Sequence, residues 1–411
     1  MAFKVDLTQV TSALSDALDL VGVDIIQHGK RVAYVAAECS RPLGWERRPQ
    51  GELFLASVLH DCGVSSTEVH HHLTASFDVE DASAHCERGY ELLAEFEPLG
   101  NVARIVRGHH TRWDAPGPRG EAAALRLASN AVFLADRVDV LVRGRSTEEI
   151  LLGRDEIVRT VEDHAGTHFA PELTAAFREA ARREAFWLTL EPRHLERNLA
   201  GAAESCCSME ISLDQLTHLA DIFSRIVDHK SAFTQSHSRG VARLSKLLGE
   251  LAGMPQEQCR LLEIAGLLHD IGKLRVPDKI LGKPGRLDHW EMAAMMRHPF
   301  ETYHILSRIR GLEEVAEWAS FHHETPAGDG YPFRLPSERL CAHARIVAVA
   351  DVVQALAQAR PYRRPLEPAR VLRIIRTMAE EGKLDAGLVA LVGDNLDACL
   401  AAAVARQAVV A

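Results

Sequence analysis

The chain has 411 residues, of which 47% are hydrophobic and 25% are charged, and this balance is typical of a folded globular protein and not of a disordered, collagen-like or coiled-coil chain. A net charge of −10 without a basic stripe argues against duplex nucleic acid as a partner, although a metal or a few arginines could still attract a small anion. The N-terminus has no signal-peptide core, no apolar run reaches 18 residues and the eight cysteines lack paired spacing, so we expect a cytoplasmic protein with reduced thiols and no membrane partner.

Helical periodicity runs through most of the chain. Apolar residues recur at i, i+3, i+4 and i+7 in residues 7–23 and again in residues 259–272, whereas strand-like alternation is scarce. The triplet His70-His71-His72 in the first half is predicted to lie in a solvated loop. Residues 191–212 mix charged and small residues with weak periodicity, which predicts a linker, and residues 397–411 are predicted to form a last helix. The fold class is therefore predicted to be all-α.

The 21 histidines include a set that recurs in two ordered copies. The chain reads LASVLHDCGV around His60 and IAGLLHDIGK around His269, and in both copies another histidine lies 32 residues earlier. The ordered sets are His28, His60, Asp61, His85, His109, His110 and Asp136 in the first copy, and His237, His269, Asp270, His298, His322, His323 and Asp351 in the second. We therefore predict two tandem domains, residues 1–196 and residues 209–411.

Each copy supplies more ligands than one zinc ion needs. Five imidazoles and two carboxylates suit two adjacent divalent ions with open positions for water. Because adjacent His269 and Asp270 can reach both ions from one helix end, Asp270 is the predicted bridge. Two ions roughly 3.5–4 Å apart would polarise a phosphodiester and generate a hydroxide near neutral pH. A single buried histidine is usually a core residue, but seven ligand-type residues repeated in the same order favour a metal centre.

These residues resemble the HD superfamily, whose pattern is H…HD…D on a helical bundle, so both halves are expected to be HD-type bundles. From about Phe233 to Tyr362 the second half resembles the HD-GYP domain, a family of metal-dependent phosphodiesterases that act on cyclic di-GMP. The motifs that carry this resemblance are HDIGK (269–273), HP (298–299), HHETPAGDGYP (322–332) and DVVQALAQARPYR (351–363). The first half is similar to the same family but degenerate.

The resemblance implies a role for individual residues of the second half. One metal would be held by His237, His269, Asp270 and Asp351, and the other by Asp270, His298, His322 and His323. Lys273 aligns with the lysine that contacts the scissile phosphate, and it is a predicted catalytic residue together with Asp270. The substrate would also meet the signature loop of Gly330, Tyr331 and Pro332, while Arg360 and Arg363 correspond to residues that hold its phosphates and guanine.

Three positions of the second half depart from the family pattern. Ala327 replaces an aspartate of the signature stretch, and Gln354 replaces a second aspartate after Asp351. Some members hold a third metal through a carboxylate four residues before the first histidine, and here that position is Phe233. Two metal ions per site are therefore expected, and none of these changes removes a ligand of the two-metal core.

The first half keeps the whole ligand set but has lost other family features. Val64 stands where the lysine would be, and Pro118 stands at the tyrosine position of the missing GYP loop. Arg145 corresponds to Arg360, and Asp114 occupies the position of Ala327. We expect this half to bind metal but to handle cyclic di-GMP poorly. Hydrolysis of another phosphoester, nucleotide sensing and a purely structural role all stay open for it, as does a homodimer or signalling-partner surface.

The resemblance implies that the second half hydrolyses cyclic di-GMP to pGpG, and whether it goes on to GMP stays open. Imidazole and carboxylate ligands favour iron or manganese over a structural zinc ion. Another cyclic dinucleotide such as 3′,3′-cyclic GMP-AMP is an alternative substrate, because the loop around Ala327 is altered. A non-catalytic, metal-stabilised nucleotide sensor is a second alternative. A diiron oxygenase is a third, against which Lys273 and the GYP loop both speak.

Overall fold

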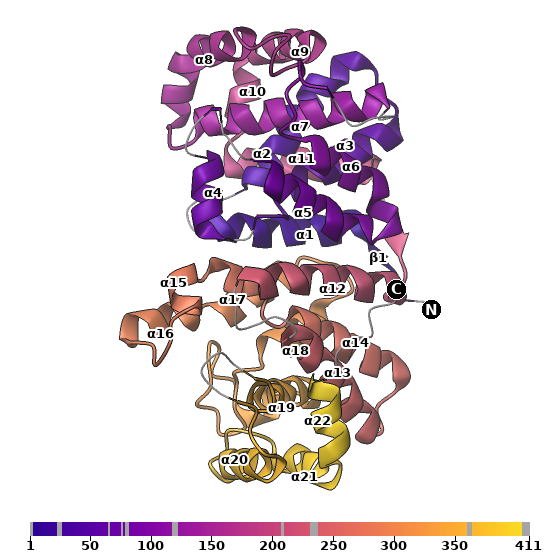
Figure 1. Ribbon diagram of the computed structural model, residues 1–411, viewed down its shortest axis with the longest axis vertical. Coiled ribbons are helices and arrows are strands. Elements are labelled where there is room, and N and C mark those ends of the chain that lie inside the picture. The colour runs from indigo at the N-terminus through magenta and orange to yellow at the C-terminus, as the bar shows by residue number, and fades with distance from the viewer. Residues whose placement is uncertain are drawn as a thin grey trace. The chain divides into compact units, whose positions relative to one another are not determined.

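The structure is a computed structural model that describes residues 3–22, 27–64, 66–74, 77–78, 82–116, 122–206, 209–230, 237–359 and 364–404 (Figure 1). It divides into two compact units, an N-terminal unit of Asp6–Glu210 and a C-terminal unit of Met1–Val5 with Ile211–Ala411. The prediction of an all-α fold is confirmed, since the described strands are β1 (Val5–Asp6) and β2 (Glu210–Ile211), two residues each, which pair with one another.

The helices of the N-terminal unit are, in chain order, α1 (Leu7–Asp19), α2 (His28–Ser40), α3 (Arg47–Leu59), α4 (Thr67–Thr74), α5 (Ser83–Ala94), α6 (Gly100–Gly108), α7 (Ala123–Val142), α8 (Thr147–Glu162), α9 (Pro171–Ala181), α10 (Glu184–Leu188) and α11 (Pro192–Cys206). Short 3-10 turns lie at η1 (Leu20–Gly22), η2 (Arg41–Leu43) and η3 (Glu97–Leu99). Helix α2 packs against α3 and α7 in the middle of the unit. The stretch 191–212, expected to be a linker, instead contains α11, whose apolar residues Leu195 and Leu199 are buried.

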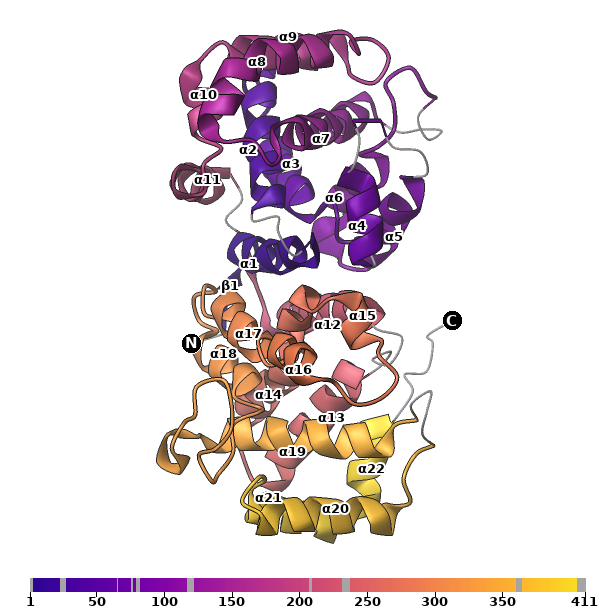
Figure 2. The same ribbon diagram turned by 90° about the vertical axis from the view of Figure 1, so that its left-hand side faces the viewer.

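The helices of the C-terminal unit are α12 (Leu213–Lys230), α13 (His237–Leu251), α14 (Gln256–Leu268), α15 (Asp278–Leu281), α16 (His289–Met295), α17 (His298–Leu306), α18 (Glu313–Ser320), α19 (Ala342–Ala357), α20 (Pro368–Glu380), α21 (Ala386–Asp394) and α22 (Leu396–Val404). Two 3-10 turns lie at η4 (Ile271–Arg275) and η5 (Ser337–Arg339). Helix α13 packs against α14, α19 and α22, and Figure 2 shows α20 and α21 on the far side of α19. The predicted last helix is present as α22, and residues 405–411 lie outside the described part.

The two units repeat the same helical framework around their centres. Helices α2, α3, α5, α6 and α7 correspond in order and in ligand position to α13, α14, α17, α18 and α19. In both frameworks the central helices are lined by fully buried small and branched residues, such as Val32 and Ala36 of α2 and Val347 and Ala350 of α19. Small side chains let the helix axes approach closely, which brings their ends into contact range. The predicted ligands lie at those ends or close to them.

A helix that crosses a bilayer needs about 20 predominantly apolar residues. Within the described ranges, no single helix is both long enough and apolar enough to cross a membrane. The pair α21 and α22 passes that test together by length and composition only, and the two helices are bent by 93° relative to one another.

Candidate metal centres

The seven predicted ligands of the C-terminal unit come from five separate helices or helix ends. His237 opens α13, His269 and Asp270 follow α14, His298 opens α17, His322 and His323 follow α18, and Asp351 lies within α19. They converge in two groups whose ligand atoms lie within 4.8 Å of one another, which are His237, His269 and Asp351, and His298, His322 and His323. The structure thus brings all seven together although they span more than a hundred residues of sequence.

Asp270 stands between the two groups. Its Oδ2 lies 3.6 Å from His237 Nε2 and 3.3 Å from His269 Nε2, whereas its Oδ1 lies 3.4 Å from His298 Nε2 and 3.9 Å from His322 Nε2. One carboxylate oxygen therefore faces each imidazole group. This is the arrangement that a carboxylate bridging two ions requires.

The imidazoles are oriented with a bare nitrogen toward the centre. The Nδ1–H groups of His269, His298 and His322 donate to backbone carbonyls three residues earlier, at 2.8, 2.7 and 2.6 Å. A histidine whose Nδ1 is held this way presents the Nε2 lone pair, as metal-binding histidines do. Burial lowers the pKa of His298 to about 3, so this ring is neutral at pH 7.

Among the residues that the structure describes, two buried polar atoms at the centre have no hydrogen-bond partner. These are Nε2 of His269 and Oδ1 of Asp270. Burial alone would raise the pKa of Asp270, but His269, Lys273 and His298 lower it well below its ordinary value, so the group is a carboxylate. Orphaned buried nitrogen and oxygen atoms cost free energy unless something compensates them. The donor set and its orientation therefore fit divalent cations.

The turn after α14 is held against the second imidazole group by a glycine. A Cβ added to Gly272 would lie 2.1 Å from the backbone oxygen of His298, and one added to Gly63 in the N-terminal unit would lie 2.0 Å from that of His85. Only glycine permits this approach, which explains the Gly two residues after each His-Asp pair. Thr302 Oγ1 also accepts a 3.1 Å bond from the amide of Gly272.

The signature loop is anchored beside His323. The Tyr331 ring stacks on the His323 ring with centroids 4.7 Å apart, and the Tyr331 amide donates to the His323 carbonyl at 3.2 Å. Gly330 has no space for a side chain, because a Cβ there would lie 2.5 Å from Glu324 Cα. Pro332 follows Tyr331 in the same loop. The loop is therefore tied to His323, one of the predicted ligands, by both backbone and ring.

Glu324 is a residue whose role the sequence reasoning missed. Its buried carboxylate accepts hydrogen bonds from the amides of Phe333 and Leu335 at 2.7 and 2.9 Å. Both amides lie just after the GYP segment, so one side chain fixes the end of the loop. Its place in the HHE motif was visible in the sequence, but nothing there pointed to the amides nine and eleven residues later.

The predicted substrate contacts Lys273, Arg360 and Arg363 are not all among the residues that the structure describes. The Lys273 ammonium lies 2.5 Å from Asp270 Oδ2 and its side chain is partly exposed, which puts a positive charge beside the centre. Arg360 and Arg363 lie outside the described residues, as do Phe233 and Pro118. Arg145, the counterpart of Arg360, is exposed after α7. Asp114 pairs with Arg112 on the surface at 3.0 Å.

The N-terminal unit contains a second centre with the same geometry. Asp61 Oδ2 lies 3.6 Å from His28 Nε2 and 3.5 Å from His60 Nε2, and Asp61 Oδ1 lies 3.5 Å from His85 Nε2. The remaining members of the predicted set are adjacent, with His85 Nε2 3.1 Å from His109 Nε2, and His110 Nε2 3.8 Å from Asp136 Oδ2. All seven predicted residues meet here as well.

The charge around the second centre differs from that of the first. Val64 is buried where the C-terminal unit has Lys273, and the nearby positive charge comes instead from Arg137, whose guanidinium donates to Asp136 Oδ2 at 2.6 Å. Arg137 is 1% exposed and also donates to the carbonyl of Leu73. Both cations therefore contact a carboxylate of the predicted ligand set, but Arg137 is buried whereas the Lys273 side chain is partly exposed.

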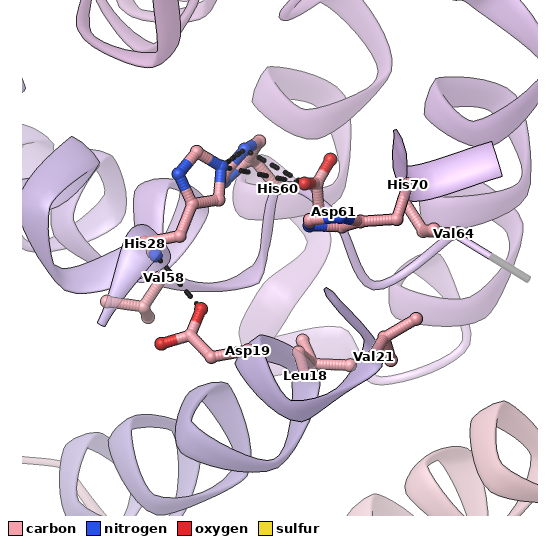
Figure 3. Close-up of a pocket in the computed structure, with 10 residues that line it drawn as sticks. Leu18, Asp19, Val21, His28, Val58, His60, Asp61, Val64 and His70 are labelled. Atoms are coloured by element: carbon pink, nitrogen blue, oxygen red, sulfur yellow. Dashed lines mark hydrogen bonds and ion pairs between the residues drawn. The ribbon is translucent and has the colours of Figure 1, made fainter. Parts of the chain in front are cut away.

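The expectation of a solvated loop at His70-His71-His72 is wrong. These residues lie in α4, and His70 is 3% exposed, while His71 and His72 are exposed. The ring centroid of His70 lies 6.4 Å from that of His28, and burial lowers the pKa of His70 to about 4. Figure 3 shows His70 beside Asp61 in a small pocket that His28, His60 and Asp19 also line. Helical spacing turned one histidine of the triplet inward and left its neighbours outside.

Asp19 and Asp228 are a further pair of equivalent residues that the sequence did not single out. Asp19 Oδ1 accepts from the amide of Gly29 at 3.2 Å, and Asp228 accepts from Ser238 Oγ at 2.8 Å, so each carboxyl group receives a bond from the second residue of α2 or α13. Burial raises the pKa of Asp19 to about 7 and that of Asp228 to about 6. Both groups fix the start of the helix that carries the first histidine of the centre.

Comparison with known proteins shows relatives over almost the whole chain. A family model described as "HD domain" matches residues 12–173 and 221–388. The 3'3'-cGAMP-specific phosphodiesterase 1 of Vibrio cholerae is 34% identical over 393 residues, which cover 93% of this chain and 90% of that protein. The cyclic di-GMP phosphodiesterase response regulator RpfG of Xanthomonas campestris is 40% identical over 142 residues, 34% of this chain and 38% of that protein.

One solved structure extends the comparison to the fold. It is that of a cyclic GMP-AMP-specific phosphodiesterase of V. cholerae, V-cGAP3, with a TM-score of 0.68 and 22% sequence identity over 96% of this chain and 98% of that one. The shared fold runs through both units. The prediction of two tandem helical bundles of this type agrees with that likeness.

Proposed function

The chain belongs to the HD-domain family, and from that membership and the geometry of its centres we propose that its C-terminal unit is a metal-dependent phosphodiesterase of cyclic dinucleotides. The observation that carries the proposal is Asp270, which turns one oxygen toward each of two imidazole groups and has the Lys273 ammonium in contact with it. Two ions that share Asp270 would each have four ligands from this set, which fills a tetrahedral zinc site but leaves open positions on a six-coordinate ion for water or substrate.

Two ions held by this set would supply Lewis-acid polarisation of the diester and lower the pKa of an attacking water. The residues of the chain do the rest. His237, His269 and Asp351 would hold one ion and His298, His322 and His323 the other, with Asp270 shared between them. Imidazole and carboxylate ligands favour iron or manganese for these ions.

Lys273 is proposed to stabilise the charge that develops on the phosphate. Its ammonium is a compact point charge, and its contact with Asp270 fixes its position beside the centre. Tyr331, packed on His323, and the loop fixed by Glu324 lie next to the second imidazole group. In this arrangement a 3′,5′-phosphodiester is attacked by water at phosphorus and its 3′-oxygen leaves, which opens a cyclic dinucleotide to a linear one.

Two candidate substrates follow from two different observations. The GYP loop and HDIGK motif favour cyclic di-GMP, which would yield pGpG. The relative matched over 93% of this chain is described as specific for 3'3'-cGAMP, and Ala327 departs from the cyclic di-GMP pattern, which together favour that dinucleotide. Comparing kcat/KM on the two substrates in one preparation decides between them.

The proposal is tested by anaerobic turnover with Mn(II) or Fe(II), followed by chromatography of the products. Wild type is compared with His269→Ala/Asp270→Ala and with His60→Ala/Asp61→Ala, which are matched because they remove the same ligands from the two centres. We expect only the first double variant to lose hydrolysis. Equal loss in both variants would assign catalysis to the centres jointly, and a wild type that leaves both dinucleotides intact would refute the proposal.

A further inference from the structure

We propose that Cys86 is a thiolate ligand of the N-terminal centre, so that this centre prefers a thiophilic ion such as zinc. None of the seven predicted ligands is a sulfur atom, and the C-terminal unit has Pro299, which offers no ligand atom, where Cys86 stands. The two centres of one chain would then select different metals.

The distances around Cys86 match those between ligands of one ion. Its Sγ lies 3.7 Å from His85 Nε2 and 4.0 Å from His109 Nε2, and these two nitrogens are 3.1 Å apart. With bonds of about 2.3 Å to sulfur and about 2.1 Å to nitrogen, a tetrahedral ion separates sulfur from nitrogen by roughly 3.6 Å and two nitrogens by roughly 3.4 Å. A single ion can therefore contact all three atoms without rearrangement of the helices.

The fourth position of that ion is supplied by Asp61. Its Oδ1 lies 3.5 Å from His85 Nε2, on the side of Asp61 that faces away from His28 and His60. The set of one sulfur, two imidazole nitrogens and one carboxylate oxygen is of the kind that zinc accepts in tetrahedral sites.

All three close ligands are held in place and kept from solvent. His85, Cys86 and His109 are 5%, 3% and 0% exposed. The Nδ1 of His109 is bonded to the Val106 carbonyl at 2.6 Å, which leaves Nε2 to face the sulfur. The Cys86 thiol donates to the Ala82 carbonyl at 3.2 Å, and this bond is the one given up when the thiol transfers its proton to solvent and the sulfur binds an ion.

The backbone explains why the sulfur reaches this position. His85 and Cys86 are consecutive residues in the first turn of α5. The start of α5 lies against the turn after α3, because Gly63 has no side chain and can approach the His85 carbonyl closely. In the C-terminal unit the same turn of α17 carries His298 and Pro299, and His298 Nε2 lies 3.3 Å from His322 Nε2. The nitrogen pair is thus common to both centres, and the sulfur is the difference.

Soft ligands change which metal is preferred. A thiolate favours zinc over manganese, whereas imidazole and carboxylate alone discriminate less. We therefore expect zinc to fill the N-terminal centre first when both metals are offered to the full chain.

The test reads the metal–sulfur bond directly and does not depend on turnover. The full-length chain is stripped of metal and loaded with Co(II), and a thiolate-to-cobalt charge-transfer band is sought in the near ultraviolet. We expect the band in wild type and in Cys62→Ser, and its loss in Cys86→Ser. Cys62 is the matched control because it is also buried in this unit, and its Sγ contacts the Gly89 carbonyl and not an imidazole.

A second measurement needs no variant and covers the case in which Cys86→Ser does not fold. X-ray absorption of the wild-type chain loaded with one equivalent of zinc should show a sulfur scatterer at about 2.3 Å. Nitrogen and oxygen scatterers alone would overturn the proposal, as would a cobalt band that survives in folded Cys86→Ser. Neither outcome bears on hydrolysis by the C-terminal unit, which is assayed separately.

Discussion

The side-chain oxygen of Gln354 accepts a 2.5 Å hydrogen bond from Nδ1 of His237. The side-chain NH2 group of Gln354 in turn donates to Gln358 Oε1 at 3.1 Å, which keeps the Gln354 side-chain oxygen directed toward the imidazole. In the N-terminal unit Asp139 makes the equivalent bond to His28 at 2.7 Å. The glutamine that departs from the family pattern therefore keeps the orienting function of the aspartate, and Nε2 of His237 stays available at the centre.

Removing this acceptor should weaken the C-terminal centre. We expect Gln354→Leu to lower manganese affinity by about 10- to 100-fold, the usual effect of losing the bond that orients a ligand histidine. Calorimetric titration of the metal-free chain measures it. Gln354→Asp reproduces the arrangement at Asp139 and should retain most of the affinity, so equal losses in the two variants would contradict the orienting role.

Lys273 is predicted to act on the transition state and not on metal binding. Replacing it by methionine should lower kcat by about 100- to 1000-fold, the range found when a single preorganised donor to a developing oxyanion is lost. Metal content and KM should change little, because Lys273 is not in the ligand set. A variant that loses its metal in parallel with its activity would instead assign Lys273 a structural role at Asp270.

The anchoring of the signature loop can be tested at Glu324. In Glu324→Gln only one side-chain oxygen is left for the amides of Phe333 and Leu335, and its NH2 group opposes the other amide. The unsatisfied buried amide should cost about 1–3 kcal/mol in the free energy of unfolding, measured by urea denaturation, with a lower kcat. The exposed Glu338→Gln, made in the same unit, is the control and should leave both quantities unchanged.

Lys230, which is not one of the predicted metal ligands, should make the stability of the fold depend on pH. Burial lowers its pKa from 10.5 to about 8, while Asp278, 3.6 Å away, partly opposes the shift. Between pH 8 and 10.5 the unfolded chain then binds more protons than the folded one at this group, so its contribution to stability rises with pH in that window. Below pH 8 the charged group is buried at a constant cost.

The measurement compares wild type with Lys230→Met by urea unfolding at pH 8 and pH 10. Wild type should gain roughly 1–2 kcal/mol relative to the variant over this interval, since each unit of pH across the shifted range corresponds to at most about 1.4 kcal/mol. Because the two proteins share all other titratable groups, the difference between their unfolding free energies isolates the contribution of Lys230. A difference that is constant with pH would mean that Lys230 is not shifted.

The sequence alone contained the repeat and the ligands. Equal spacings of 32 residues between the first histidine and the His-Asp pair, and of 24 residues between the later histidines, together with similar motifs around Asp136 and Asp351, identified the fourteen ligand-type residues that the structure gathers into two centres. This prediction works because the same spacing between the same residue types, found twice in one chain, indicates the same arrangement of helices twice. A repeated arrangement of helices brings the same side chains together in each copy. The all-α fold followed from periodicity for the same reason.

Other features depended on contacts between segments that sequence separation does not determine. His70 faces the N-terminal centre because α4 packs with one side inward, and Glu324 reaches two amides because the loop folds back over it. The Cys86 sulfur lies beside two imidazole nitrogens because Gly63 lets α5 approach. Packing and local polarity decide which face of a short helix is buried and which side chain meets which atom. The sequence therefore determined which residues could bind metal, and only the tertiary structure decided which neighbours orient them and which sulfur atom lies within reach of them.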